Sequence, residues 1–316
     1  MKAFVCNKYG PPEVLKVKEM PKPVPKDNEV CIKNFATAVT GSDVLIRGAD
    51  MPFFIRLMFQ VMIGFKKPRK PIPGLVFAGE IESVGKAVKR FNKGDQVYGF
   101  TGYSFGAYAE YICISEEDSK LGCIEIKHPG MSYEEAAAAV YAGVLAPYFL
   151  EKGNIQKGQK VLVYGASGAI GTASVQLAKN LGAEVTGICS TRNIELVKSL
   201  GADQVIDYTK EDVANSKERY DFILDAVPYG KIDRKKLKAQ CKNALSPNGK
   251  HVSIDDGSPK LKAEYLEQLN SLFETGKFKV VIDRKYPLEQ IVEAHRYVDT
   301  GRKKGNVVIT VQHDKT

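Results

Sequence analysis

Residues 160–171 decide the fold, and they read Lys-Val-Leu-Val-Tyr-Gly-Ala-Ser-Gly-Ala-Ile-Gly. The apolar run at 161–164 is rich in β-branched and aromatic side chains, as in a buried strand. It leads into Gly165, Gly168 and Gly171 and then into an apolar helical pattern. A strand, a glycine turn and a helix in this order predict a dinucleotide site, because the glycines permit a tight turn, close approach of backbone N–H groups to a pyrophosphate, and close helix packing. The helix N-terminus would add partial positive charge beside the phosphates.

Two other glycine motifs do not fit this stretch. A P-loop needs Lys followed by Ser or Thr after its last glycine, where this chain has Thr172-Ala173. A nucleophile elbow needs a glycine two residues beyond Ser167, where Ala169 stands. The spacing Gly-x-x-Gly-x-x-Gly also differs from the commonest dinucleotide fingerprint, so a glycine-rich turn without a ligand stays open as the alternative.

Length and composition indicate a water-soluble chain of 316 residues with two domains, 44% of its residues hydrophobic and 26% charged. The formal charge is +9, but Lys and Arg are interspersed with Asp and Glu, so we expect no nucleic-acid partner and attribute the bias to attraction of an anionic cofactor. No signal peptide is expected, because Met1-Lys2 leads directly into a strand-like run. The six cysteines contain no Cys-x-x-Cys pair, which predicts neither a metal cage nor a disulfide scaffold and favours a reducing, cytoplasmic location.

The order of expected elements predicts an α/β protein with one domain inserted in another. The first part is β-rich, with strands expected at 3–7, 15–20, 29–38, 76–84, 96–99 and 107–114 and a short helix at 43–47. From residue 134, helices alternate with strands at 160–164, 184–188, 204–207, 222–225 and 250–254, a pattern typical of a parallel sheet. The tail, with elements at 278–282, 288–300 and 306–311, is expected to return to the β-rich domain. The predicted domains are therefore 1–126 plus 277–316, and 127–276.

Residues 53–65 are almost entirely apolar and are followed by four basic residues before position 71. The run is shorter than the roughly 20 apolar residues that a spanning helix needs, so we expect no stable membrane insertion. Three interpretations stay open: a mobile lid over a substrate pocket, a core helix, and an interfacial membrane anchor.

The segment after the second strand of the parallel sheet indicates which nucleotide is bound. An NAD enzyme places Asp or Glu there to bind the ribose hydroxyls, but residues 187–193 contain no acid. Ser190, Thr191 and Arg192 instead offer two hydroxyls and a guanidinium to a 2′-phosphate, which favours NADPH over NADH. The alternative is an ordinary polar loop that caps the next helix.

The whole chain resembles the medium-chain dehydrogenase/reductase superfamily, in its zinc-independent quinone oxidoreductase (zeta-crystallin-like) branch. The motifs that carry the resemblance are Gly74-Leu75-Val76-Phe77-Ala78-Gly79-Glu80, Val84-Gly85, Gly94-Asp95-Gln96-Val97, Ala142-Gly143-Val144, the glycine turn, Leu200-Gly201-Ala202-Asp203 and the ending at 297–308. The resemblance implies a Rossmann domain inserted in a GroES-like catalytic domain, with the active site in the cleft between them.

The same resemblance implies roles for individual residues. Zinc-dependent relatives have metal ligands at the positions of Thr40, Leu75 and Ala142, and these three side chains cannot build a zinc site. We expect Thr40, Ser42 and Ala142 beside the cofactor instead. The resemblance further places Ser167, Gly168, Ala169 and Ile170 at the pyrophosphate, Tyr208 on the 2′-phosphoribose, and Val252, Ser253 and Ile254 against the cofactor. Tyr208 could instead close a turn, and Val252 and Ile254 could be core residues.

Two departures from the family pattern affect function. Quinone reductases usually carry Asn-Pro-x-Asp where this chain has Thr40-Gly41-Ser42-Asp43, which leaves the substrate class open. The sixth Rossmann strand is not expected after Asp256, so a homodimer built on that sheet edge is possible but not predicted.

These expectations favour metal-free hydride transfer from NADPH to a small electrophilic acceptor, either a quinone or an α,β-unsaturated carbonyl, since a simple ketone would need a Lewis acid. Ser42 could orient the cofactor ribose or relay a proton, or it could only cap a helix at Asp43. Tyr103 could donate to a substrate carbonyl, or only pack a loop. A reductase or dehydrogenase of simple aldehydes or alcohols and a non-catalytic NADPH-binding module are the alternative functions.

Overall fold

The fold is described from a computed structural model, which covers residues 1–48, 53–213, 218–227, 233–257 and 259–313. Contacts divide the chain into two compact units. The first, here called the β-rich unit, comprises Met1–Tyr141, Lys260–Glu274 and Ile282–Thr316. The second, called the parallel-sheet unit, comprises Ala142–Pro259 and Thr275–Val281.

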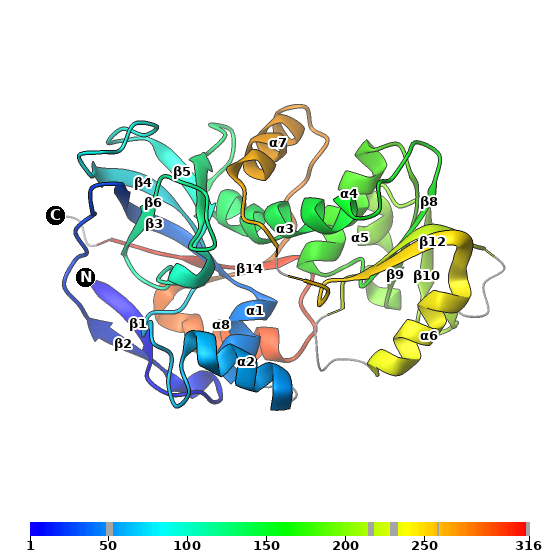
Figure 1. Cartoon of the computed structure of the whole chain (residues 1–316), viewed down its shortest axis with the longest axis horizontal. Coiled ribbons are helices and arrows are strands. Elements are labelled where there is room, and N and C mark those ends of the chain that lie inside the picture. The colour runs from blue at the N-terminus through cyan, green and yellow to red at the C-terminus, as the bar shows by residue number, and fades with distance from the viewer. Residues whose placement is uncertain (49–52, 214–217, 228–232, 258, 314–316) are drawn as a thin grey trace. The chain divides into compact units, whose positions relative to one another are not determined.

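The β-rich unit is built on a sheet with the order β13-β14-β3-β4-β5-β7, with β6 pairing β3 off this path, and on a separate β1-β2 pair (Figure 1). The strands are β1(Lys2–Cys6), β2(Leu15–Glu19), β3(Glu29–Val39), β4(Val76–Val84), β5(Gln96–Phe100), β6(Tyr111–Ser115), β7(Cys123–Ile126), β13(Ile282–Pro287) and β14(Asn306–Thr310). The helices are α1(Gly41–Gly48), α2(Phe53–Ile63), α7(Ala263–Glu274) and α8(Ile291–Asp299). Antiparallel pairing of β14 with β3 confirms that the C-terminal segment returns to this unit.

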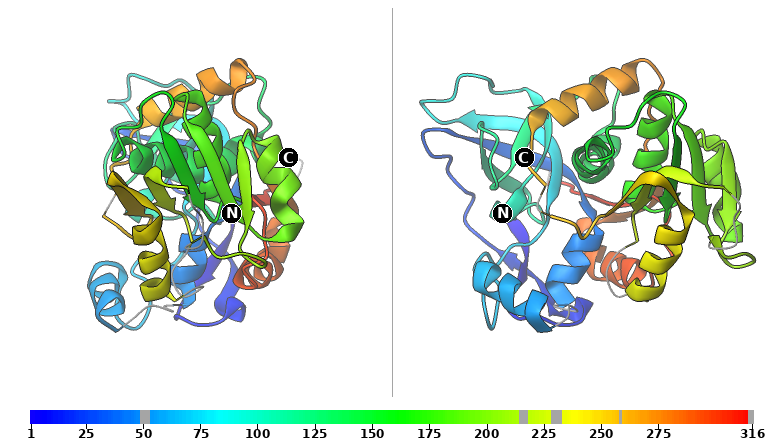
Figure 2. Two further views of the ribbon diagram at one scale, coloured as in Figure 1. Left: turned by 90° about the vertical axis from the view of Figure 1, so that its right-hand side faces the viewer. Right: turned by 45° about the vertical axis from the view of Figure 1, so that its right-hand side comes forward.

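The parallel-sheet unit has five parallel strands in the order β10-β9-β8-β11-β12 (Figure 2). They are β8(Lys160–Tyr164), β9(Glu184–Cys189), β10(Gln204–Asp207), β11(Tyr220–Asp225) and β12(Leu245–Ser253), with the helices α4(Ala169–Asn180), α5(Ile194–Ser199) and α6(Arg234–Ala244). Val161, Leu162 and Val163 at the sheet centre are fully buried, as the apolar run predicts. In chain order this is 3-2-1-4-5, the order of a Rossmann sheet, and the described residues add no sixth strand.

The borders between the units differ from the predicted division at 126/127 and 276/277. The long helix α3(Tyr133–Glu151) changes units at Tyr141, and α7 groups with the β-rich unit. α7 is held there because the Tyr98 hydroxyl donates to the Leu266 carbonyl at 2.8 Å and Asn270 Nδ2 donates to the Ile126 carbonyl at 2.8 Å. These tertiary contacts have no signature in the local sequence pattern.

Several strand predictions need correction. The strand expected at 250–254 begins earlier, as β12 at Leu245–Ser253. The strand expected at 107–114 begins only at Tyr111, since Ala107 and Tyr108 bond irregularly to Gly74 and Pro73. The strand expected at 278–282 is instead β13 at Ile282–Pro287. β7 was not predicted at all. In each case, pairing partners distant in sequence decide where the strand begins.

α2 occupies most of the apolar segment at 53–65 and is 11 residues long. Among the described residues, no helix combines the length and apolar character that crossing a bilayer requires. The core-helix interpretation is wrong for Arg56, Leu57, Val61 and Met62 of this helix, which are exposed, whereas Ile63 at its end is buried.

Candidate functional site

The three glycines of the turn after β8 have different steric surroundings. Gly165 has φ +78°, a left-handed conformation that favours glycine. A Cβ at Gly171 would lie 2.2 Å from the Gly165 carbonyl oxygen, so only glycine lets α4 pack this close to the strand. A Cβ at Gly168 would meet only that same oxygen, at 3.4 Å. Gly168 is therefore the position of the turn where the chain itself leaves room for a side chain.

The N-terminus of α4 presents backbone rather than side chains. Its N-cap is Gly168, which has no side chain to cap the first turn. The first N–H groups of a helix have no partner within the helix, and the helix dipole makes this end attractive to anions. Ala169, Ile170 and Gly171 form this first turn, so the predicted pyrophosphate residues lie together at one helix end.

Asn193, which the sequence analysis missed, links the glycine turn to the loop after β9. Its side chain is buried, and Nδ2 donates to Ser167 Oγ at 2.9 Å and to Ser190 Oγ at 3.4 Å. Its Oδ1 is buried without a hydrogen-bond partner in the described part of the chain. An unpaired buried acceptor between the two predicted cofactor segments fits a polar ligand that supplies a donor. The one signal in the sequence for this role is that Asn193 directly follows Arg192 in the predicted cofactor loop.

The loop after β9 contains both cationic and anionic groups. Arg192 is exposed, in line with a role toward a phosphate. Thr191, however, donates its hydroxyl to Asp207 at the end of β10, and Asp207 also accepts from the Thr209 hydroxyl at 2.7 Å. The Thr191 hydroxyl, followed by that of Thr209, lowers the pKa of Asp207 to about 2, so its carboxylate is ionised at neutral pH. The segment at 187–193 lacks an acid, but the adjacent strand supplies one to it.

Tyr208 follows Asp207 and is 55% exposed. Its backbone N–H donates to the Cys189 carbonyl at 3.2 Å, so the residue does close the turn beside β9, as the alternative interpretation held. The ring nevertheless faces solvent, where it is free to stack on a ligand.

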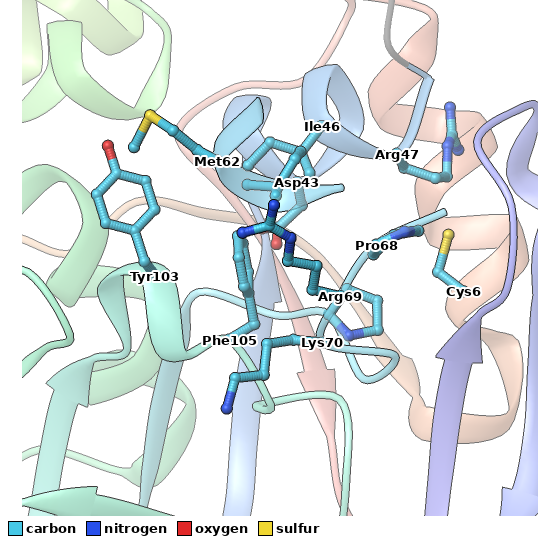
Figure 3. A pocket seen from close by; sticks show the side chains of 12 residues that line it. Cys6, Asp43, Ile46, Arg47, Met62, Pro68, Arg69, Lys70, Tyr103 and Phe105 are labelled. Carbon is cyan, nitrogen blue, oxygen red and sulfur yellow. The ribbon is translucent and has the colours of Figure 1, made fainter. Parts of the chain in front are cut away.

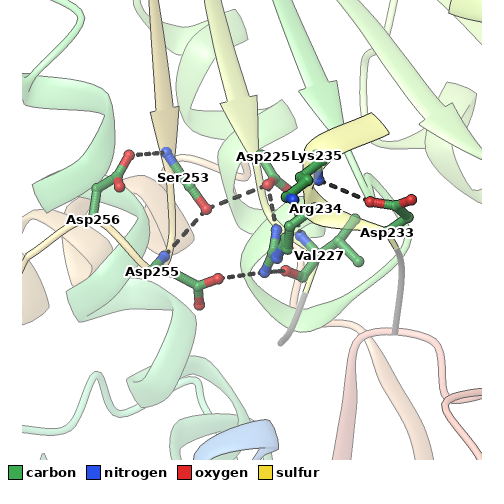
Figure 4. Close-up of polar contacts among 8 residues, drawn as sticks. All are labelled: Asp225, Val227, Asp233, Arg234, Lys235, Ser253, Asp255 and Asp256. Carbon is green, nitrogen blue, oxygen red and sulfur yellow. Dashed lines mark hydrogen bonds and ion pairs between the residues drawn. The ribbon is translucent and has the colours of Figure 1, made fainter. Parts of the chain in front are cut away.

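The ends of β11 and β12 are joined by a network around Arg234 that the sequence did not predict (Figure 4). Arg234 donates to Asp225, to Asp255 and, at 2.6 Å, to the Val227 carbonyl. Ser253 donates its hydroxyl to Asp225 at 3.3 Å and its backbone N–H to Asp256 at 2.8 Å. Burial raises the pKa of Asp225, against the opposing charge of Arg234.

Hydrogen bonds to Asp225 and Asp256 hold the segment at 252–254 in place. Val252 and Ser253 are buried, and the Ile254 N–H donates to the Asp225 carbonyl at 3.0 Å. The hydroxyl and the backbone N–H of Ser253 are therefore already paired within the unit. The contact of these three residues with a cofactor stays a prediction.

In the β-rich unit, β3 ends in a reciprocal helix cap. The Asp43 carboxylate accepts from the Thr40 N–H at 2.9 Å and the Thr40 hydroxyl at 2.6 Å, and the Asp43 N–H donates to Thr40 Oγ1 at 3.1 Å. Thr40 and not Ser42 thus caps α1, which corrects the alternative given for Ser42. Burial raises the pKa of Asp43 to about 7, although the bonds from Thr40 oppose this shift.

Ser42 lies within the first turn of α1, and its hydroxyl hydrogen-bonds to the Tyr141 hydroxyl at 2.7 Å. Tyr141 is buried at 8% exposure and stacks on Phe100 with ring centroids 5.9 Å apart. Two hydroxyls in contact can pass a proton between them or present one donor to a ligand. Tyr141 could not be found from sequence, because 99 residues separate it from Ser42.

A cavity of about 360 Å³ lies beside α1 in the same unit (Figure 3). Its walls are mainly apolar and include Ile46, Met62, Ile63 and Phe105, with Tyr103 at one side. Arg69 and Lys70 also line it, and in Figure 3 Arg69 extends toward α1 while Lys70 points the opposite way. The volume is within the range of small-molecule pockets. Met62 and Ile63 make the end of α2 part of the cavity wall, as the lid interpretation requires.

The three positions that hold zinc in metal-dependent relatives do not fit that metal. Thr40 commits its hydroxyl to Asp43, while Leu75 and Ala142 are buried and have no ligand atom. Elsewhere in the described residues, no group of three or more His, Cys, Asp or Glu side chains is arranged to hold a metal ion.

Comparison with known proteins gives three family matches and full-length relatives. The family model for the alcohol dehydrogenase GroES-like domain matches residues 26–127, and two models described as zinc-binding dehydrogenase match 169–271 and 257–309. The chain is 33% identical to 2-methylene-furan-3-one reductase of Solanum lycopersicum, covering 98% of this chain and 79% of the relative. It is 30% identical to the chloroplastic NADPH-dependent alkenal/one oxidoreductase of Arabidopsis thaliana, with the same coverage. Among solved structures, the quinone oxidoreductase from Coxiella burnetii superposes with a TM-score of 0.82 at 27% identity, over 99% of each chain.

Proposed function

The chain belongs to the medium-chain dehydrogenase/reductase superfamily and is an oxidoreductase, and from this premise we propose that it reduces quinones or α,β-unsaturated carbonyl compounds with NADPH and without zinc. One observation carries the proposal: the turn at Gly165, Gly168 and Gly171 leaves an uncapped helix N-terminus beside the unpaired acceptor of Asn193. The names of the tomato and Arabidopsis relatives support the acceptor class.

The residues of the parallel-sheet unit would hold the cofactor in the following way. The N–H groups of Ala169 and Ile170 would bind the pyrophosphate, and the side chains of Arg192 and Ser190 would bind the 2′-phosphate. Thr191 would act on Asp207 rather than on the phosphate, because its hydroxyl is already donated. When bound, NADPH supplies a hydride at its nicotinamide ring.

The residues of the β-rich unit would serve the acceptor. The apolar walls of the cavity suit a conjugated ring or alkenyl chain, and Tyr103 offers a phenol donor to a carbonyl oxygen. The Ser42–Tyr141 pair would hold the proton that the reduced acceptor takes up. A conjugated acceptor develops its negative charge on an oxygen that hydrogen-bond donors can stabilise, whereas a simple ketone or aldehyde is better served by a Lewis acid. Threonine, leucine and alanine at the zinc positions supply none.

A steady-state panel tests this function. NADPH and NADH oxidation is followed with a quinone, an enone, an alkenal and a saturated ketone, each with and without a strong zinc chelator. We expect saturable turnover with the conjugated acceptors, a preference for NADPH, and no effect of the chelator. Tight NADPH binding without turnover of any acceptor would establish the non-catalytic module instead, and chelator-sensitive ketone reduction would establish the simple carbonyl reductase.

Three narrower expectations accompany the proposal. The cytoplasmic location stays a prediction, because the relatives include chloroplastic and mitochondrial proteins. The absence of a nucleic-acid partner is likewise a prediction, and a homodimer stays an open possibility; salt-dependent binding assays and gel filtration would test them.

A further inference from the structure

The exposed side of α2 carries apolar side chains that the proposed reaction does not use. Leu57, Val61 and Phe65 are 40%, 53% and 57% exposed. Leu57 and Val61 are one helical turn apart on the same side of α2, and Phe65 follows the helix at the same spacing. None of the three lines the cavity, whose wall is formed by Met62 and Ile63. We call Arg56, Leu57, Val61, Phe65, Lys66 and Lys67 the α2 surface.

The charged side chains of α2 and of the residues that follow it are all basic. Arg56, Lys66, Lys67, Arg69 and Lys70 are all exposed. The sequence contains no Asp or Glu from Met51 through Gly79. Exposed apolar side chains flanked by cations, on a helix too short to cross a bilayer, are the pattern of a helix that lies in the membrane interface.

We propose that the α2 surface docks on an anionic phospholipid bilayer. Leu57, Val61 and Phe65 would enter the boundary between head groups and acyl chains, and Lys66 and Lys67 would pair with lipid phosphates and carboxylates. A second copy of the chain is a poorer occupant, because two such surfaces would face each other with like charge. Nucleic acid would use the cations but not the apolar side chains. The docking does not depend on the proposed reaction.

Vesicle flotation tests this proposal with the full chain. Phosphatidylcholine vesicles are compared with vesicles that also contain phosphatidylserine, at low and raised salt. We expect flotation only with phosphatidylserine, weakened by salt. Lys66→Glu/Lys67→Glu should weaken binding at least roughly tenfold, since each basic residue contributes about 1 kcal/mol near such a surface. The matched control Lys235→Glu/Lys236→Glu changes two exposed lysines of α6 and should float like the wild type.

A second variant separates docking from simple charge attraction. Leu57→Ser/Val61→Ser keeps every charge and alters only exposed side chains, and we expect it to lose most flotation while its turnover of a water-soluble acceptor is unchanged. Full flotation of this variant would overturn the proposal, because the apolar side chains would then not enter the membrane. Equal flotation with neutral vesicles would also overturn it. So would a wild-type dimer in vesicle-free buffer that becomes a monomer in the Leu57→Ser/Val61→Ser variant.

A second inference comes independently from the register of β3 and β6. Cys31 and Cys113 face each other directly across this antiparallel pair. The flanking pairs Asn34–Glu110 and Asn28–Glu116 are joined by backbone hydrogen bonds of 2.9 and 3.1 Å. Because hydrogen-bonded and non-hydrogen-bonded pairs alternate along an antiparallel ladder, the cysteines occupy a non-hydrogen-bonded pair, with Cα atoms about 4.5 Å apart. That spacing lies at the short end of the disulfide range, roughly 4.4–6.8 Å.

The surroundings of the two thiols give them different roles in oxidation. A hydrogen bond between the side chains of Cys31 and Cys113 lowers the pKa of Cys31, and the charge of Lys22 acts in the same direction. The same hydrogen bond raises the pKa of Cys113, so Cys113 holds its proton more tightly than Cys31 does. Cys31 is fully buried, whereas Cys113 is partly exposed. Cys113 is therefore the thiol that an external oxidant reaches, and Cys31 is the thiolate placed to attack it.

We infer that Cys31 and Cys113 form a disulfide under oxidising conditions. With oxidised glutathione, the partly exposed Cys113 sulfur would attack the disulfide, and its proton would pass to the glutathione that is released. Cys31 would then attack the Cys113 sulfur and release the second, so two protein thiols are oxidised while one glutathione disulfide is reduced to two thiols.

Non-reducing peptide mass spectrometry after treatment with oxidised glutathione tests this inference. We expect a linked pair of peptides containing Cys31 and Cys113, two hydrogens lighter than the reduced pair, and recovery on reduction. Cys31→Ser should leave glutathione attached to Cys113, while Cys123→Ser, at another buried thiol, should leave the linked pair intact. Glutathione retained on Cys113 in the wild type, or linkage formed only after unfolding in urea, would overturn the inference.

Discussion

Both units contain a strand that runs through a turn into a helix, and the two helix N-termini are treated in opposite ways. After β8, the N-cap of α4 is Gly168, and the first turn is uncapped by any side chain at that position. After β3, Thr40 and Asp43 cap α1 reciprocally. The first arrangement leaves the backbone N–H groups of the first turn without a side-chain partner, as an anion site requires. The second pairs the N–H groups of Thr40 and Asp43 with side chains. A backbone site and a side-chain site thus arise from the same connection.

The largest expected effect separates the two glycines of the backbone site. Gly171→Ala places a Cβ 2.2 Å from the Gly165 carbonyl oxygen and should destabilise the parallel-sheet unit by about 1–3 kcal/mol. Gly168→Ala meets no contact closer than 3.4 Å and should fold normally but bind NADPH weakly, because the methyl group stands where the pyrophosphate would approach. Thermal unfolding and NADPH titration of both variants measure this difference. Equal unfolding free energies for Gly171→Ala and Gly168→Ala would show that the two glycines do not differ in their steric role.

The next largest effect concerns Arg192. Arg192→Ala should lower the ratio of kcat/KM for NADPH over that for NADH about tenfold to a hundredfold, since a charge-assisted hydrogen bond contributes about 1.5–3 kcal/mol. Asp207→Asn provides the converse test, because it removes the carboxylate beside Thr191 and should raise NADPH preference. Unchanged selectivity in Arg192→Ala would mean that this loop does not bind the 2′-phosphate.

The capped helix should show a pH dependence of its own. The folded-state pKa of Asp43, about 7, exceeds its ordinary value of 3.8, so the folded protein holds this proton more tightly than the unfolded chain does. The resulting stabilisation is complete below about pH 4 and is lost as the pH rises through about 7, with a slope of at most about 1.4 kcal/mol per pH unit. Asp43→Asn should flatten unfolding free energies over this window. Parallel profiles for wild type and variant would show that Asp43 does not titrate there.

The smallest expected effect is at the hydroxyl pair. Ser42→Ala and Tyr141→Phe each remove the 2.7 Å bond and should lower kcat severalfold, with the double variant no worse than the more severe single one. Enone turnover under single-turnover conditions measures the chemical step directly. Additive losses would show that the two hydroxyls act separately.

The contrast between the sites also explains what the sequence could predict. The glycine turn, β8 and the return of the chain through β14 are encoded in local patterns, and the structure confirms them. Three side chains could not be predicted because the fold brings their hydrogen-bond partners to them. Asn193 bonds to Ser167, Tyr141 to Ser42 and Arg234 to Asp225, which are 26, 99 and 9 residues away. The same holds for Asp207, which reaches Thr191 only because β10 lies beside β9. Local chemistry is predictable from sequence when the backbone supplies it, and much less so when distant side chains do.

Isotope transfer tests the central claim most directly. NADPH deuterated at either face of nicotinamide C4 is supplied with a conjugated enone, and the product is analysed by mass spectrometry and NMR. We predict that one of the two labelled cofactors delivers a single deuterium to the β-carbon of the product and that the other delivers none. Product formed without label from either cofactor, or NADPH consumed without reduced enone, would contradict hydride transfer by this protein.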